Sequence, residues 1–277
     1  MRYRQLGTSG LTVAVVGLGC NNFGRRIDLE RTHAVVDAAL ELGITLLDTA
    51  DVYGNRGGSE TFLGEVLKGR RDQVVLATKF GAPMGGREEE ARGSRRYVRR
   101  ALEASLRRLQ TDYVDLYQQH TPDPRTPLEE TIAALDELVT EGKVRYAGSS
   151  NFAAWRIADA DWIARTERRS RMISAQNHYS LLERAVEQEV IAACLEHGVG
   201  VLPYFPLGNG LLTGKYRRGE QPPEGARLQG RSDLLTDEAF GKVEALEKYA
   251  AGAWEPTADD LVALDDIVPR GSSVWRH

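Results

Sequence analysis

The chain has 277 residues, of which 42% are hydrophobic and 27% charged, a balance typical of a folded globular protein rather than a disordered one. Its 36 Lys and Arg residues against 40 Asp and Glu residues give a net charge of -4, which argues against a nucleic-acid-binding protein. Cys20 and Cys194 are too few for a disulfide framework and lack metal-ligand spacing, and no apolar run approaches the roughly 20 residues of a membrane span. Since residues 1–5 also contain no apolar signal region, we expect a soluble cytoplasmic protein without a membrane or nucleic-acid partner.

Short apolar runs recur along the chain and predict β-strands. Most are continuously apolar rather than alternating, as expected for strands that are covered on both faces. Ahead of them, residues 2–11 are expected to form a small hairpin. In chain order, the runs cover residues 13–19, 44–48, 74–79, 113–117, 144–148, 173–176 and 199–203.

Amphipathic stretches between these runs predict helices. The clearest cover residues 29–42, 95–109 and 127–141, with apolar residues at helical spacing. The first of these helices is expected to bury one apolar face, made of Ala34, Val35, Ala38, Ala39 and Leu42. A helix often ends at a residue with a left-handed backbone conformation, which glycine adopts most easily. Three glycines stand at such positions, between a predicted helix and the next strand: Gly43, Gly142 and Gly198.

Seven strand–helix units in series, without a reversal of direction, predict a parallel barrel. The alternative, a doubly wound sheet, usually has a glycine-rich phosphate turn after its first strand. Here that turn covers Gly17 to Asn22 and lacks the third glycine of the dinucleotide fingerprint. We therefore predict an α/β fold, a parallel barrel of the TIM type with an N-terminal β-hairpin cap, and a single domain over residues 1–277; the family resemblance described below implies the complete (β/α)8 form.

Polar and aromatic side chains follow the predicted strands where each strand ends. In a parallel barrel these ends meet around one mouth, which is where the chemistry of such barrels takes place. The candidates are Asp48, Tyr53, Lys79 and His120. Each has an ordinary alternative: a helix cap for the aspartate, a turn aromatic for the tyrosine, a solvated lysine, and a loop histidine. Their convergence on one mouth favours the catalytic interpretation.

Together these four residues suit an acid–base relay. An unperturbed tyrosine has a pKa of about 10, and a nearby ammonium lowers it. Lys79, paired with Asp48 and near the Tyr53 hydroxyl, could tune Tyr53 to deliver a proton to a carbonyl oxygen that His120 orients. Because no side chain supplies a hydride, a nicotinamide cofactor is implied.

Further polar groups stand where such a cofactor could bind. Ser150, Asn151 and Gln176 offer amide and hydroxyl groups for a carboxamide. Tyr204 offers a face on which a flat ring could stack.

Several motifs, in the expected order, resemble those of the aldo-keto reductases. They cover residues 4–11, 47–54, 78–80, 115–120, 148–152, 176–180, 204–208 and 210–216. The resemblance implies that Tyr53 is the general acid, that Lys79 and Asp48 tune it, and that His120 positions the carbonyl group. It also implies a cofactor-binding set consisting of Gly19, Cys20, Asn21, Ser150, Asn151, Gln176, Tyr204, Phe205, Leu207, Gly210 and Lys215. No metal is expected.

The C-terminal part departs from the family pattern. After the helix expected at 240–249, the family continues into a further helix and an eighth strand–helix unit, and this eighth unit is missing here. We expect a stretch to have been left out of the sequence, visible as a chain break between about Tyr249 and Ala253, where one Cα–Cα step would exceed the usual distance of about 3.8 Å. The segment 268–272 resembles a protease-cleavable tag, with a native tail as the alternative.

Three functions follow as hypotheses. The first is an NAD(P)H-dependent oxidoreductase that reduces an aldehyde or ketone to an alcohol, or catalyses the reverse oxidation, with NADP(H) expected ahead of NAD(H). Its partner would be a small carbonyl or alcohol substrate. The second is a nicotinamide-binding module that senses redox state and regulates a partner. The third is a barrel lyase or isomerase of an unrelated class, which would need no nicotinamide.

Overall fold

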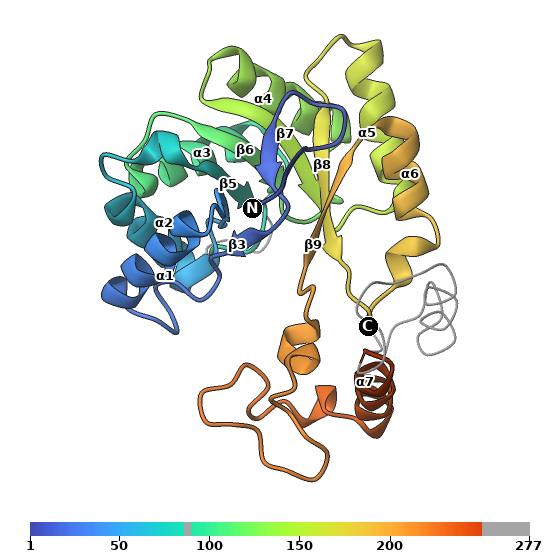
Figure 1. Ribbon diagram of the computed structural model, residues 1–277. Coiled ribbons are helices and arrows are strands. Elements are labelled where there is room, and N and C mark those ends of the chain that lie inside the picture. The colour runs from blue at the N-terminus through green and yellow to red at the C-terminus, as the bar shows by residue number, and fades with distance from the viewer. Residues whose placement is uncertain (86–89, 251–277) are drawn as a thin grey trace. The chain divides into compact units, whose positions relative to one another are not determined.

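The computed structural model describes residues 1–85 and 90–250, which form two compact units (Figure 1). The first unit contains Met1–Gln176 and Ala193–Leu202. The second contains Asn177–Ala192 and the described residues from Pro203 onward. The expected break after Tyr249 reaches beyond the described residues, and the tag-like segment 268–272 lies outside them entirely.

One parallel sheet runs through the chain in sequence order. Its strands are β3 (Gly17–Gly19), β4 (Leu46–Asp48), β5 (Val75–Phe80), β6 (Val114–Gln119), β7 (Val144–Ser150), β8 (Met172–His178) and β9 (Gly200–Tyr204). Each strand from β3 to β7 pairs in parallel with the next. Sequential parallel pairing with a helix in each connection is the topology of the (β/α)8 barrel, so the predicted TIM-barrel fold is confirmed. Within the described part of the chain there is no eighth parallel strand, and β3 and β9 are the two end strands of the sheet.

Helices occupy most connections between the strands (Figure 1). They are α1 (Leu29–Glu41), α2 (Tyr53–Val66), α3 (Arg95–Leu109), α4 (Leu128–Thr140), α5 (Ala154–Thr166) and α6 (Val190–His197), with α7 (Asp237–Ala250) in the second unit. Short 3-10 turns cover Arg71–Gln73, Ala185–Glu187, Gly208–Thr213 and Ser232–Leu234. Gly43, Gly142 and Gly198 have positive φ angles of 77°, 76° and 65°, which confirms their predicted place after helices. None of the helices in the described part of the chain is both long and apolar enough to cross a bilayer.

The N-terminal hairpin is longer than expected. β1 (Tyr3–Gln5) pairs antiparallel with β2 (Thr12–Ala14), so the apolar run predicted as one strand over 13–19 is divided between the hairpin and β3. Val13 packs in a core cluster with Leu6 and Leu11, and no polar residue marks the boundary in this run. The hairpin turn is bonded to the N-terminal side of β9, because the Thr8 N–H donates to the Gly198 carbonyl at 2.9 Å. The hairpin therefore covers the barrel end opposite the C-terminal ends of the strands, as the sequence predicted.

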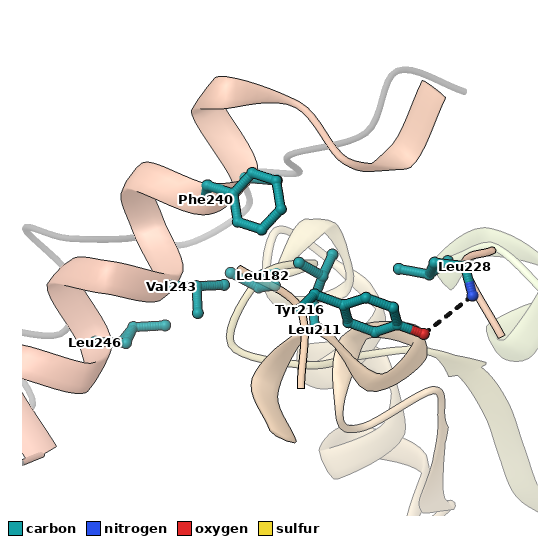
Figure 2. Close-up of a cluster of buried hydrophobic side chains, with 8 residues drawn as sticks. Leu182, Leu211, Tyr216, Leu228, Phe240, Val243 and Leu246 are labelled. Atoms are coloured by element: carbon teal, nitrogen blue, oxygen red, sulfur yellow. Dashed lines mark hydrogen bonds between the residues drawn. The ribbon is translucent and has the colours of Figure 1, made fainter. Parts of the chain in front are cut away.

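The second unit has its own core. Phe240, Val243 and Leu246 on one face of α7 pack on a cluster completed by Leu182, Leu211, Tyr216, Leu228 and Ala239 (Figure 2). The Tyr216 hydroxyl within this core accepts a hydrogen bond from the Leu228 N–H at 3.0 Å. Tyr216 can therefore be buried, because its hydroxyl group has a hydrogen-bond partner.

Candidate active site

Asp48 and Lys79 form an ion pair at the C-terminal ends of β4 and β5. Lys79 Nζ lies 2.6 Å from Asp48 Oδ2 and also donates to the Thr49 carbonyl at 3.0 Å. Lys79 is fully buried, and burial alone would lower the pKa of its ammonium. Asp48 and Tyr53 act in the opposite direction, so the pKa of Lys79 is raised and the side chain keeps its charge. The sequence predicted this pairing.

Tyr53 stands at the start of α2, between Lys79 and His120. Lys79 Nζ lies 5.0 Å from the centre of the Tyr53 ring, and the His120 ring meets that ring edge-on at 5.7 Å and 88°. Burial raises the pKa of Tyr53, while Lys79 lowers it less strongly. The expected direction of the Lys79 effect is therefore right, but the expectation of a lowered pKa overall is wrong. Tyr53 is a protonated phenol at neutral pH, as a proton donor must be.

His120 is a neutral imidazole. Its backbone N–H donates to the Phe80 carbonyl at 2.8 Å, and its Nδ1 is buried without a hydrogen-bond partner among the described residues. Burial lowers the pKa of His120 to about 4; Lys79 adds to this effect and Asp48 opposes it. A neutral imidazole donates one hydrogen bond but carries no spare proton at neutral pH. This state favours orientation of a carbonyl oxygen by His120 and leaves proton donation to Tyr53.

Two glutamines hold the second oxygen of Asp48. Asp48 Oδ1 accepts from Gln176 Nε2 at 3.0 Å and from Gln118 Nε2 at 3.3 Å. Ser174 Oγ in turn donates to Gln118 Oε1 at 3.2 Å. Gln118 and Ser174 were not among the site residues predicted from the sequence. Strand register could have indicated Gln118, because Gln118 pairs with Lys79 across β5 and β6 and therefore faces the same side of the sheet.

Ser150 and Asn151 lie at the end of β7, beside His120 and Gln176. Ser150 Oγ donates to the Gln176 carbonyl at 2.8 Å, and Asn151 Nδ2 donates to the His120 carbonyl at 2.9 Å. Asn151 has a left-handed backbone, with a φ angle of 59°. This cluster combines hydroxyl and amide groups that can both donate and accept, which is the chemistry that a nicotinamide carboxamide requires. The residues present therefore fit the expected group.

The residues after β3 adjoin Asp48 through the backbone. The Cys20 N–H donates to the Asp48 carbonyl at 2.9 Å, and Gly19 is the register partner of Asp48. A Cβ built on Gly19 would meet no atom within 4 Å, so there is open space beside the end of β3. Asn21 lies two residues after Gly19 in the chain. Burial strongly raises the pKa of the Cys20 thiol, which excludes a reactive thiolate there at neutral pH.

The other five expected cofactor residues lie in the second unit. The Tyr204 ring stacks on His178 at 5.2 Å and 12°, and Phe205 meets Tyr204 edge-on at 5.3 Å. Gly210 has a φ angle of 96°, and a Cβ there would lie 2.8 Å from Lys215 Cε. Lys215 Nζ lies 5.3 Å from the centre of the Tyr216 ring, and Leu207 is 54% exposed. The structure thus groups these residues with one another, and their cofactor role stays a prediction.

The described residues contain no cluster of three or more His, Cys, Asp or Glu side chains that could hold a metal ion.

The model of the Aldo/keto reductase family matches residues 15–262. The chain belongs to this family. A protein described as "Uncharacterized oxidoreductase YrpG" from Bacillus subtilis is 42% identical over 245 residues, covering 85% of this chain and 74% of its own length. "Probable aldo-keto reductase 1" from Glycine max is 39% identical over 278 residues, covering 96% of this chain and 78% of its own.

Members of the aldo/keto reductase family are oxidoreductases that use a nicotinamide cofactor. Membership of this family therefore supports an enzymatic function of this kind. It disfavours the unrelated lyase or isomerase. The cofactor form and the substrate are separate questions.

Proposed function

We propose that this aldo/keto reductase reduces an aldehyde or ketone to an alcohol with NAD(P)H, or catalyses the reverse oxidation. The supporting observation is the ion pair of the buried Lys79 with Asp48 at 2.6 Å beside a protonated Tyr53, with the neutral His120 facing the same tyrosine. This arrangement offers one proton donor, one fixed cation and one uncharged hydrogen-bond donor. A polarised carbonyl group needs these three elements when a hydride arrives at its carbon.

Each residue has one role in the proposed reaction. The Tyr53 hydroxyl gives its proton to the carbonyl oxygen, and the Lys79 ammonium stabilises the phenolate that remains. Asp48 holds Lys79, and His120 donates a hydrogen bond that orients the carbonyl oxygen. A nicotinamide cofactor, whose carboxamide Ser150, Asn151 and Gln176 would hold, supplies the hydride when bound.

Of the two cofactor forms, we propose NADP(H), which the family resemblance favours. The family's usual contacts to the adenosine 2′-phosphate come from the region around the eighth strand–helix unit, which is missing from this sequence. Cofactor titrations that compare the dissociation constants of NADPH and NADH test this choice directly. Equal or tighter binding of NADH would contradict it.

We also propose that the substrate is a small carbonyl or alcohol compound and that the protein acts in the cytoplasm without a nucleic-acid or membrane partner. The net charge of -4 supports this proposal. A panel of aldehydes, ketones, aldoses and steroids, assayed in both directions, would define the substrate class.

The decisive experiment follows NADPH absorbance with a generic aldehyde such as 4-nitrobenzaldehyde. We expect consumption of NADPH that depends on enzyme concentration. Binding of NADPH without turnover of any carbonyl compound would favour the redox-sensing module instead. Absence of both binding and turnover would overturn the proposal.

A further inference from the structure

A second carboxyl group, Asp51, is buried next to the site but takes no part in the ion pair. Asp51 is 1% exposed, and both of its carboxyl oxygens are buried without a hydrogen-bond partner among the described residues. Its backbone N–H donates to the Lys79 carbonyl at 3.1 Å. Asp51 is thus bonded to the residue that carries the catalytic ammonium, and it stands two positions before Tyr53.

The neighbouring carboxylate, Glu60 on α2, already has a full set of partners. Glu60 is 0% exposed; its Oε1 accepts from the Thr78 hydroxyl at 2.6 Å and its Oε2 from Arg108 Nε at 2.7 Å. The Arg108 guanidinium is thus bonded to Glu60, and Asp51 receives no hydrogen bond from it. A charged Asp51 would be a second buried anion without a hydrogen bond, which is energetically unfavourable.

The charged and titratable groups around Asp51 come from four elements. They are Glu60 on α2, Arg108 and Tyr97 on α3, Lys79 on β5 and Tyr117 on β6. Burial and then Glu60 raise the pKa of Asp51 to about 8, while Arg108 and Lys79 oppose this shift less strongly. Burial and the lack of a partner for either oxygen in the described part of the chain both favour the protonated form of Asp51 over the charged one.

We propose that Asp51, a buried carboxyl group beside Lys79 without a hydrogen-bond partner among the residues described, is a positioning residue of this reductase: it is neutral in the working enzyme, and its ionisation weakens Tyr53 as an acid by acting through Lys79. This inference rests on the proposed carbonyl reduction for its kinetic consequence. Its protonation state does not depend on that reaction.

The coupling has a defined direction. Lys79 lowers the pKa of Asp51, so the two charges attract each other when Asp51 loses its proton, and Lys79 then stabilises the Tyr53 phenolate less. The pKa of Tyr53 rises further, and transfer of its proton to a carbonyl oxygen becomes slower. Reduction by the wild-type enzyme is therefore expected to decline in two steps, the first near the ionisation of Asp51 and the second at the higher pH where Tyr53 itself ionises.

Two substitutions change the first step in different ways. Asp51→Asn removes the ionising group while preserving its shape, so the first step should disappear. Glu60→Gln removes the competing anion and frees Arg108 for Asp51, so the first step should move to lower pH. A purely structural role of these side chains would lower the rate at every pH and would leave the midpoint unchanged.

The deciding measurement is a pH titration by NMR of the full chain carrying ¹³C-labelled aspartate carboxyl and tyrosine Cζ atoms. Asp51→Asn and Tyr53→Phe serve to assign the two signals. We expect a carboxyl signal that is protonated at pH 7 and titrates near pH 8, and a Tyr53 midpoint that is lower in Asp51→Asn than in wild type by on the order of half a unit. An Asp51 carboxylate already ionised at pH 7, or an unchanged Tyr53 midpoint, would overturn the inference.

The kinetic measurement is the pH profile of aldehyde reduction in wild type, Asp51→Asn and Glu60→Gln. Loss of the first step in Asp51→Asn and its acid shift in Glu60→Gln support the inference, and superimposable profiles contradict it. If wild type reduces no carbonyl compound, the proposed function fails by itself while the NMR titration still decides the state of Asp51. If Glu60→Gln fails to fold, the NMR titrations of wild type and Asp51→Asn give the same decision.

Discussion

Lys79 keeps its charge and His120 loses it, although both side chains lie in the same small cluster. Lys79 has a carboxylate 2.6 Å from its ammonium, whereas His120 Nδ1 has no partner among the described residues. Burial disfavours the charged form of both, and only Lys79 has an interaction strong enough to reverse that effect. The same comparison applies to Tyr53, where burial exceeds the effect of Lys79 and keeps the phenol protonated.

Replacement of the proton donor should abolish most of the activity. Tyr53→Phe removes only the hydroxyl, so we expect turnover to fall by about 10²–10⁴ while cofactor affinity stays close to that of wild type. The two quantities are measured by steady-state kinetics with a good aldehyde and by calorimetric titration with NADPH. Undiminished reduction by Tyr53→Phe would remove Tyr53 from the acid role.

The buried histidine should make the protein sensitive to acid. The pKa of His120 is about 4 in the fold and 6.5 as the ordinary value, so the unfolded chain binds the proton more strongly between these pH values. The contribution to stability is complete above pH 6.5 and is lost as the pH falls from 6.5 towards 4, by up to about 3 kcal/mol.

His120→Gln tests this effect because glutamine does not titrate. Urea unfolding of both proteins at several pH values should show that the free energy of unfolding falls more steeply in wild type over this range. Asp51 has the opposite sign, because its raised pKa favours the fold as the pH falls, but it is present in both proteins and cancels in the difference. Equal pH slopes would contradict the low pKa of His120.

At the level of the strands, register decides which side chains meet. Lys79 on β5 pairs with Gln118 on β6, and Gln118 pairs with Gly148 on β7. Gly148 supplies the room for this arrangement, because a Cβ at that position would lie 2.1 Å from Ser174 Oγ and 3.1 Å from Gln118 Cγ. The glycine therefore allows the Ser174–Gln118–Asp48 chain of hydrogen bonds to form.

A methyl group at this glycine should disturb both stability and activity. We expect Gly148→Ala to lower the free energy of unfolding by about 1–3 kcal/mol, as overpacking typically does, and to reduce turnover by displacing Gln118 from Asp48. Gly19→Ala is the matched control for stability, because a Cβ there meets nothing within 4 Å. The packing argument would be wrong if urea unfolding gave the same loss for both variants.

Helices show the limits of periodicity as a guide to burial. In α1 the buried residues are Thr32, Val36 and Ala39, whereas Val35 is 38% and Leu42 is 67% exposed, contrary to the expected apolar face. Thr32 can be buried because its hydroxyl donates to the Asp28 carbonyl at 2.7 Å. In a helix rich in alanine several faces are similarly apolar, and the packing of neighbouring elements decides which of them is buried.

The start of α2 is a second case in which the sequence was insufficient. Residues 54–57 all have positive φ angles, of 65°, 60°, 70° and 113°, so the chain makes a left-handed turn directly after Tyr53. Two of these four residues, Asn55 and Arg56, are not glycine. Such a run is energetically unfavourable for L-residues, and packing around the turn must hold it in place.

On the scale of the whole molecule, each unit has a separate core. Phe240 belongs to the core of the second unit, and Leu135, which is 1% exposed on α4, belongs to the first. We expect Phe240→Ala to destabilise its own unit by about 3–5 kcal/mol. Amide hydrogen exchange should show lower protection in α7 and around Leu211, with β4 to β7 still protected.

Leu135→Ala is the reciprocal control for this prediction and should lower protection in α4 and the adjoining strands of the first unit. Equal loss of protection in both units, for both variants, would mean that the two units unfold as one.

The sequence by itself determined the order of strands and helices, the presence of the hairpin and the family. It also singled out Asp48, Tyr53, Lys79 and His120 as candidate site residues. These features depend on local periodicity, on turn residues such as Gly43, and on short motifs at strand ends, all of which are contained in a few consecutive residues. They can therefore be predicted without knowing which distant segments of the chain are in contact.

Only the tertiary structure decided the state and the surroundings of these groups. Asp48 receives its bonds from Lys79, Gln118 and Gln176, which lie 31, 70 and 128 positions away along the chain. The raised pKa of Tyr53, the neutral state of His120 and the buried carboxyl of Asp51 all follow from the exclusion of water by such distant segments. Because desolvation depends on everything packed around a group, no local pattern could have revealed it.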